Sequence, residues 1–153
     1  MFWNLVFIFW NFPRRKIAAT IKPVHLLALD IGLKRTGVAF GDTKSGVIVA
    51  LDTLKHDTTK ELSQKVEQIV RSKKIERIII GLPLLLSGEE GSQVNLVRSA
   101  AKEIEKIVNI PLEFIDERYT TKTGQNGLRS DPDARAACSI LGIKMDRKNA
   151  IDM

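Results

Sequence analysis

The stretch Leu26–Asp42, which reads LLALDIGLKRTGVAFGD, decides the fold of this chain. Its first apolar run carries a single acid, Asp30, and the basic pair Lys34 and Arg35 leads into a second apolar run over residues 36–40. The pattern predicts two antiparallel strands joined by a short turn. Because an acid buried without a partner is costly, we expect a metal ion or a metal-bound phosphate beside Asp30. The alternative is a strand-end acid that accepts hydrogen bonds from backbone amides.

The remaining elements follow from hydrophobic periodicity. Short apolar runs predict three further strands, over residues 47–54, 75–82 and 111–115. Apolar residues at helical spacing predict helices over residues 58–74, 93–108, 119–128 and 131–141. Gly142 is expected to end the last helix, which leaves residues 144–153 as a basic tail.

This order of elements predicts one α/β domain over residues 24–153. We expect a five-stranded mixed sheet with strand order 3-2-1-4-5 and helices on both faces, in which parallel strands are added beside the first strand. Residues 1–23 are expected to lie outside the fold. Their apolar stretch, residues 1–10, is too short to span a bilayer, and the alternative is a segment that touches a membrane surface.

The composition favours a polyanionic partner. The formal net charge is +6, which points to nucleic acid first, although such a charge also keeps a protein soluble. The single cysteine, Cys138, excludes an intramolecular disulfide framework and fits a reducing cytosol. The two histidines, His25 and His56, lack the spacing of a zinc site.

Acids end two of the predicted strands at one edge of the sheet. Asp30 ends the first strand, and Asp116 and Glu117 follow the strand over residues 111–115. The carboxyl ends of neighbouring parallel strands open on one edge, where α/β folds bind ligands. Two Mg²⁺ ions bridged by such acids suit phosphodiester hydrolysis. The alternative is a local ion-pair cluster of Asp116, Glu117 and Arg118 that caps the next helix.

Several residues are candidates for contacts with phosphate groups. Lys34 and Arg35 follow Asp30 in the turn, and Ser87 lies in the loop GLPLLLSGEEG over residues 81–91. The full candidate set for nucleic-acid binding is Lys34, Arg35, Ser87, Arg118, Lys144, Arg147 and Lys148. The alternatives are that Lys34 and Arg35 are solvated charges in the turn, and that residues 81–91 form a strand end and a loop without a binding role.

Three motifs together resemble one family. LALDIGLKRTGVAFGD over residues 27–42, IIIGLPLLLSGEEGSQVNLV over 78–97 and IDERYTT over 115–121 resemble the YqgF (RuvX-like) family of bacterial RNase H-fold proteins. Its members are named as candidate pre-16S rRNA nucleases or Holliday junction resolvases. The resemblance implies an RNase H-like fold, Mg²⁺ or Mn²⁺ as cofactor and a cytoplasmic location. It also implies catalytic, metal-binding acids at Asp30, at Glu117 with Asp116 beside it, and at Asp152.

The end of the chain departs from the family pattern. Members continue past the last acid into an Asp-x-x-Ala-Ala helix that packs on the sheet, whereas one residue follows Asp152. We therefore expect a truncated C-terminal helix. Activity would then be low, because a catalytic group needs a supporting shell to hold it in place.

The leading hypothesis is a metal-dependent endonuclease that trims the 5′ end of precursor 16S rRNA, and the rRNA assignment rests on the resemblance alone. The expected partner is precursor rRNA or branched DNA, without stable membrane association, and the chain is a monomer or a homodimer. One alternative is a Holliday junction resolvase, which a dimer would favour because resolution needs two coordinated cuts. Others are a non-catalytic nucleic-acid-binding protein and a nucleotide-binding lobe of the actin and sugar-kinase superfold, for which the chain is too short.

Overall fold

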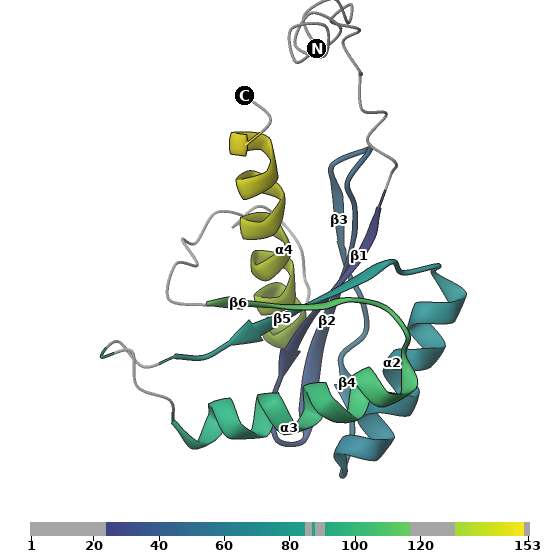
Figure 1. The fold of residues 1–153 in the computed structure, drawn as a ribbon, viewed down its shortest axis with the longest axis vertical. Helices are drawn as coiled ribbons and strands as arrows, with labels where there is room; N and C mark the ends of the chain where they lie inside the picture. The colour runs from purple at the N-terminus through teal and green to yellow at the C-terminus, as the bar shows by residue number, and fades with distance from the viewer. Residues whose placement is uncertain (1–23, 85–86, 88–90, 117–130, 152–153) are drawn as a thin grey trace, which may run out of the picture.

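The computed structural model describes residues 24–84, 87, 91–116 and 131–151. Its strands are β1 (His25–Ile31), β2 (Arg35–Asp42), β3 (Val47–Ala50), β4 (Leu54–Lys55), β5 (Arg77–Leu82) and β6 (Leu112–Asp116). Its helices are α2 (Thr59–Ser72), α3 (Ser92–Ile107) and α4 (Pro132–Ile151), as Figure 1 shows. The predicted extension over residues 1–23 and the predicted helix over 119–128 lie outside these ranges.

The sheet has six strands instead of the predicted five, and apart from the additional strand β4 it follows the predicted order. Its strands run β3-β2-β1-β5-β6, with β1 antiparallel to β2 and parallel to β5, and β5 parallel to β6. The predicted strand over residues 47–54 is divided, because both β3 and β4 pair with β2. Ala39 pairs with Ala50 and Thr36 pairs with Leu54, so three residues lie opposite two between these pairs. One extra residue of this kind forms a bulge and interrupts the strand.

The two faces of the sheet carry different helices. Leu27, Leu29 and Ile31 of β1 belong to the core that α2 and α3 cover. Leu26 and Ala28 belong to the core under α4, on the opposite face (Figure 1). Side chains alternate between faces along a strand, so Asp30 lies on the α4 face. The predicted arrangement of helices on both faces is confirmed.

Helix α2 begins at a capping box. The Thr58 side chain accepts a hydrogen bond from the Glu61 backbone N–H, and the Glu61 carboxylate accepts one from the Asp57 backbone N–H at 2.9 Å. The first bond satisfies a backbone donor that the first turn of a helix leaves without a partner, and the second fixes the residue that precedes the N-cap. The predicted helices over 58–74 and 93–108 agree within two residues at each end with α2 (Thr59–Ser72) and α3 (Ser92–Ile107).

The prediction that Gly142 ends the last helix is wrong. Helix α4 continues to Ile151 and covers 20 residues. Side chains on both sides of Gly142 pack on β2: a Cβ at Gly41 would lie 3.2 Å from Leu141 Cδ1 and 3.0 Å from Met145 Cε. This packing outweighs the cost of about 1 kcal/mol for a glycine inside a helix. Residues 132–151 thus form a C-terminal helix that packs on the sheet. The family pattern predicts such a helix only from Asp152 onward.

No helix in the described ranges is long and apolar enough to cross a membrane.

Candidate active site

Asp30 lies at the end of β1, beneath the first turn of α4. It pairs across the β1–β2 ladder with Gly37. A Cβ at Gly37 would overlap the carbonyl oxygen of Asp133 and would lie 3.2 Å from the Ala134 nitrogen. Only glycine leaves room for so close an approach of backbone to backbone. Helix α4 therefore brings its first turn to the Asp30–Gly37 pair.

Arg35 holds this turn in place. Its Nη2 lies 2.6 Å from Asp131 Oδ2, and its Nε lies 3.0 Å from Asp133 Oδ2. The Arg35 side chain is half exposed, so the ion pairs add little stability, but a guanidinium that binds two carboxylates fixes their geometry. Both acids also lie at the positive end of the helix dipole.

The pKa of Asp131 is lowered by its surroundings. Burial acts to raise this pKa, but the hydrogen bond from the Asp133 backbone N–H and the charge and hydrogen bond of Arg35 outweigh it. Asp131 is therefore a carboxylate at neutral pH and presents negative charge beside the first turn of α4.

Asp116 reaches the same edge of the sheet but lies on the other face. It ends β6 and pairs with Leu82 at the end of β5. The preceding residue, Ile115, is buried in the core under α4. Alternation along β6 therefore places Asp116 on the face opposite to Asp30. Two strand spacings also separate β1 from β6, which is about 10 Å.

The other predicted acids and one predicted cation cannot be placed. Glu117, Arg118 and Asp152 lie outside the described residues, so the convergence of Asp30, Glu117 and Asp152 stays a prediction. In the part of the chain that the structure describes, no three His, Cys, Asp or Glu side chains gather as a metal site. The acids near Asp30 are nevertheless carboxylates, the ligand type that Mg²⁺ and Mn²⁺ prefer.

Lys144 has a structural role between α4 and the sheet. Its Nζ lies 2.6 Å from Glu113 Oε1, and Arg77 approaches the same carboxylate at 3.5 Å. Lys144 follows Asp133 by eleven residues, which is about 16 Å along a helix. The side chains of Arg147 and Lys148 lie outside the description, and Ser87 is exposed between β5 and α3.

Lys34 and Arg35 are the predicted phosphate contacts that lie at the Asp30 end of the sheet. The turn that carries them joins β1 to β2, and Lys34 Nζ forms an ion pair with Asp57 at 2.8 Å. Both side chains line a pocket of about 380 Å³.

The sequence interpretation missed Asp131 and Asp133. Residues 133–137 read DARAA, which is the Asp-x-x-Ala-Ala spacing of the helix that family members pack on the sheet. Of the two alanines that the motif specifies, Ala137 is buried and Ala136 is half-buried, and Ala134 is buried beside them. The motif was thus visible in the sequence, nineteen residues before Asp152, where it was expected.

Comparisons with known proteins agree with this architecture. The family model for RuvX, described as Holliday junction resolvase, matches residues 24–146. A Rickettsia rickettsii (strain Sheila Smith) protein named as a candidate pre-16S rRNA nuclease is 34% identical over 131 residues, covering 79% of this chain and 85% of that protein. An Acaryochloris marina protein of the same name is 30% identical over 135 residues, covering 82% and 94%.

Solved structures share the fold. RuvC of T. thermophilus, solved in complex with a Holliday junction substrate, has a TM-score of 0.61 at 10% identity and covers 82% of this chain and 95% of its own. The fowlpox virus Holliday junction resolvase has a TM-score of 0.50 at 14% identity, covering 81% and 99%. These likenesses place the chain among RuvC-like RNase H folds. Because the family model spans most of the sequence and curated relatives exceed 30% identity, this protein belongs to the RuvX family.

Proposed function

We propose that this protein is a metal-dependent endonuclease that hydrolyses phosphodiester bonds in structured nucleic acid and processes the 5′ end of precursor 16S rRNA. The names of its curated relatives support the substrate. One observation carries the chemistry: Asp30 lies at the end of the central strand β1, under the first turn of α4, where Asp131 and Asp133 lie. The proposal places the protein in the cytoplasm, where rRNA precursors are processed.

The metal ligands in this proposal are Asp30, Glu117 and one acid of the C-terminal region. Asp116 lies beside Glu117 but faces away from Asp30, which favours Glu117 for the role. Two residues compete for the third position: Asp152, as the family pattern implies, and Asp133, whose backbone lies on Gly37, the strand partner of Asp30. Bound Mg²⁺ or Mn²⁺ would neutralise these carboxylates and supply an activated water and a charge to stabilise the leaving oxygen.

The cations at this end of the sheet have separate roles. Arg35 positions the acids of α4 through its two ion pairs. Lys34 is largely exposed and is able to approach a phosphate once its ion pair with Asp57 opens. Arg118, Ser87, Lys144, Arg147 and Lys148 are proposed as further phosphate contacts.

A cleavage assay tests the proposal. Purified protein is incubated with a precursor 16S rRNA 5′ leader and with a four-way DNA junction, each in Mg²⁺, in Mn²⁺ and in EDTA. We expect metal-dependent cleavage of the RNA that falls about a hundredfold or more in Asp30→Asn and Glu117→Gln, because a misplaced metal costs at least that much. Asp52→Asn, a change at an exposed acid outside the site, is the matched control.

The third ligand is identified in the same assay. Asp133→Asn and Asp152→Asn are compared at equal protein concentration, with circular dichroism as a check on folding. Loss of cleavage in one variant alone assigns the role to that residue. Absence of metal-dependent cleavage by the unmodified protein, with binding retained, would overturn the proposal and favour a nucleic-acid-binding function.

A second candidate function is Holliday junction resolution. The description of the matching family model favours it. Resolution requires two coordinated cuts, so it predicts symmetric cleavage of the four-way junction by a homodimer. Junction cleavage without cleavage of the RNA leader, with a dimer mass in solution, would replace the rRNA proposal with this one.

A further inference from the structure

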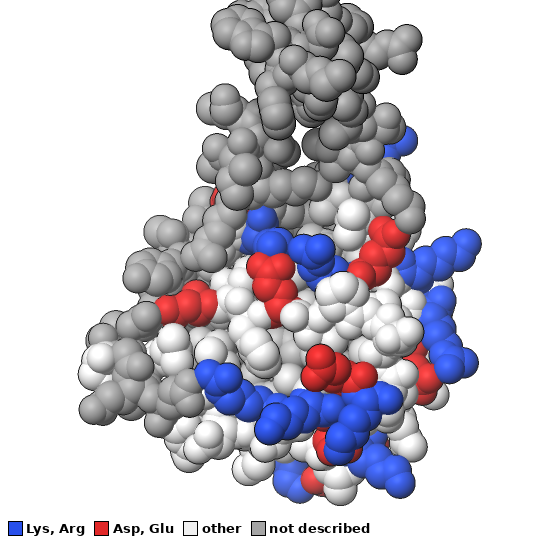
Figure 2. Space-filling view, viewed as in Figure 1, with Lys and Arg blue, Asp and Glu red and all other residues white. Residues whose placement is uncertain are grey.

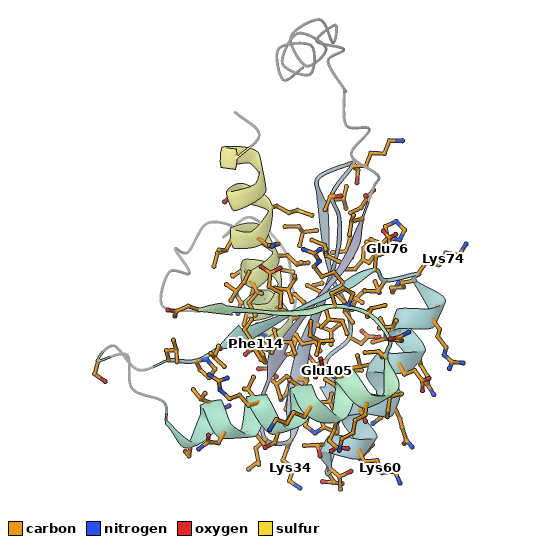
Figure 3. All side chains as sticks on the ribbon, in the orientation of Figure 1. Lys34, Lys60, Lys74, Glu76, Glu105 and Phe114 are labelled. Atoms are coloured by element: carbon orange, nitrogen blue, oxygen red, sulfur yellow. The ribbon has the colours of Figure 1, made fainter. Side chains whose placement is uncertain are left out.

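A second feature lies at the same end of the sheet as Asp30, on the opposite face. A pocket of about 380 Å³ is formed by the β1–β2 turn, by β4 and by the first turns of α2. Its lining residues are Lys34, Arg35, Lys55, His56, Asp57, Glu61 and Lys65. Figure 3 shows Lys34 at the lower end of the β1–β2 hairpin, near the start of α2 where Lys60 is labelled.

The pocket carries an excess of positive charge. Four basic and two acidic side chains line it, and the acids are matched by the ion pairs Lys34–Asp57 at 2.8 Å and Lys65–Glu61 at 2.7 Å. Arg35 is engaged with the acids of α4. Lys55 is exposed and forms no ion pair within the described ranges. Lys55 is therefore a cation without an ion pair at the edge of the pocket in the described ranges, which favours an anionic ligand.

His56 gives the pocket a buried hydrogen-bonding group. The residue is only 6% exposed, and its Nε2 lies 2.9 Å from the Thr36 hydroxyl. Its Nδ1 is buried and has no hydrogen-bond partner in the described part of the chain. When the Thr36 hydroxyl donates to Nε2, the neutral ring carries its proton on Nδ1 and offers a donor without an acceptor. A buried donor left in this state is costly, and a ligand oxygen in the pocket would remove that cost once a small shift of the surrounding side chains exposes Nδ1.

The pocket is continuous with the candidate active site. Arg35 lines the pocket and also contacts Asp131 and Asp133 above Asp30. Thr36, which holds His56, precedes Gly37, which pairs with Asp30. Figure 2 shows a band of Lys and Arg side chains across the lower part of the molecule, and α3 presents exposed Arg98, Lys102 and Lys106. A polyanionic strand that passes Arg35 from the Asp30 site therefore meets further positive charge on the face that α2 and α3 cover.

We propose that this pocket binds a backbone phosphate of the nucleic-acid strand that flanks the cleaved bond, through Lys55 and His56. The proposal rests on the proposed nuclease function, because that function supplies the polyanion and its path past Arg35. Lys34 and Lys65 add charge from the two sides of the pocket, where each is already held by a carboxylate. Inorganic phosphate offers the same chemistry, and the experiment separates the two sources.

The test measures binding in EDTA, so that cleavage plays no part. The affinity for a single-stranded RNA from the precursor 16S rRNA leader is measured over a series of KCl concentrations for the unmodified protein, Lys55→Gln and Lys60→Gln. Loss of one phosphate contact lowers the slope of log K against log salt by about 0.7. We expect this reduction in Lys55→Gln only. Lys60 has the same charge and lies on exposed α2 surface outside the pocket, so it is the matched control.

A nuclear magnetic resonance readout reports on the pocket directly. The chain has two histidines. His25 begins β1 at one end of the β1–β2 hairpin, and His56 contacts Thr36 at the other end. We expect the ring resonances of His56 to shift on addition of RNA while those of His25 stay in place. Inorganic phosphate at the same phosphate concentration should shift them far less. Equal shifts with phosphate and RNA, or equal salt slopes in Lys55→Gln and Lys60→Gln, would overturn the proposal.

This design separates failure of the pocket from failure of the nuclease function. If the pocket proposal alone is wrong, the unmodified protein cleaves in Mg²⁺ and Lys55→Gln keeps the full salt slope. If the nuclease proposal alone is wrong, the unmodified protein does not cleave in either metal, yet Lys55→Gln still loses part of the slope and His56 still responds to RNA.

Discussion

The backbone of Asp133 rests directly on Gly37. No side chain fits at Gly37, because a Cβ would overlap the Asp133 carbonyl oxygen. This contact joins the start of α4 to the strand beside Asp30, and it explains how residues near the end of the chain reach the end of β1.

Substitution of Gly37 tests this contact. We expect Gly37→Ala to lower the free energy of unfolding by about 2–3 kcal/mol, because the added methyl group meets rigid backbone rather than a flexible side chain. Urea denaturation measures the change. Cleavage should also fall, since α4 must shift away from Asp30. An unchanged midpoint and m-value would show that α4 does not press on Gly37.

Substitution of Gly142 has the opposite effect. Nothing lies within 4 Å of a Cβ at Gly142, which is inside α4. We expect Gly142→Ala to raise the free energy of unfolding by about 0.5–1 kcal/mol, because alanine loses less backbone entropy in a helix. The same urea series provides the measurement. Destabilisation would mean that the helix ends at this residue, as its glycine suggests from sequence alone.

Substitution of Arg35 separates positioning from stability. We expect Arg35→Gln to lower the cleavage rate by about tenfold to a hundredfold, because the acids of α4 lose the guanidinium that orients them. The free energy of unfolding should change by less than about 1 kcal/mol, since the ion pairs are half exposed. Arg71→Gln is the control, because Arg71 forms a comparable surface ion pair with Glu67 at 2.6 Å. Equal rates for the two variants would remove Arg35 from the site.

The buried ring of His56 predicts a pH dependence of stability. Burial lowers the pKa of His56 below its usual value near 6.5. Between the usual pKa and the lower pKa of the folded state, the unfolded chain binds a proton that the folded chain does not, so stability falls as the pH falls from neutral through about 6.5 into the acidic range. The loss from this residue is at most about 1.4 kcal/mol per pH unit.

Thermal and urea unfolding of the unmodified protein and His56→Gln at the two ends of this pH range measure the effect. The difference between the two proteins should be larger at the neutral end than at the acidic end, because only the unmodified protein loses stability by protonation of His56. A difference that is equal at both pH values would contradict the neutral, buried state of the ring.

Local patterns in the sequence determined much of the fold. The alternation and turn in Leu26–Asp42 predicted the β1–β2 hairpin and the position of Asp30 within it, because both depend on residues that are close along the chain. The strand order also followed, since short connections restrict the ways in which such elements pack. The helical spacing of apolar residues over 58–74 predicted α2 in the same way.

Only the tertiary structure decided which side chains meet at the end of β1. Arg35 and Asp131 form an ion pair although 96 residues separate them, and no periodicity reports on such a pair. Helix α4 passes through Gly142 because Leu141 and Met145 pack on β2, so burial outweighs a local signal to stop. Packing between distant segments thus placed Asp131 and Asp133 near Asp30 and formed the pocket around His56. The sequence by itself determined the strands β1 and β2 against which these segments pack.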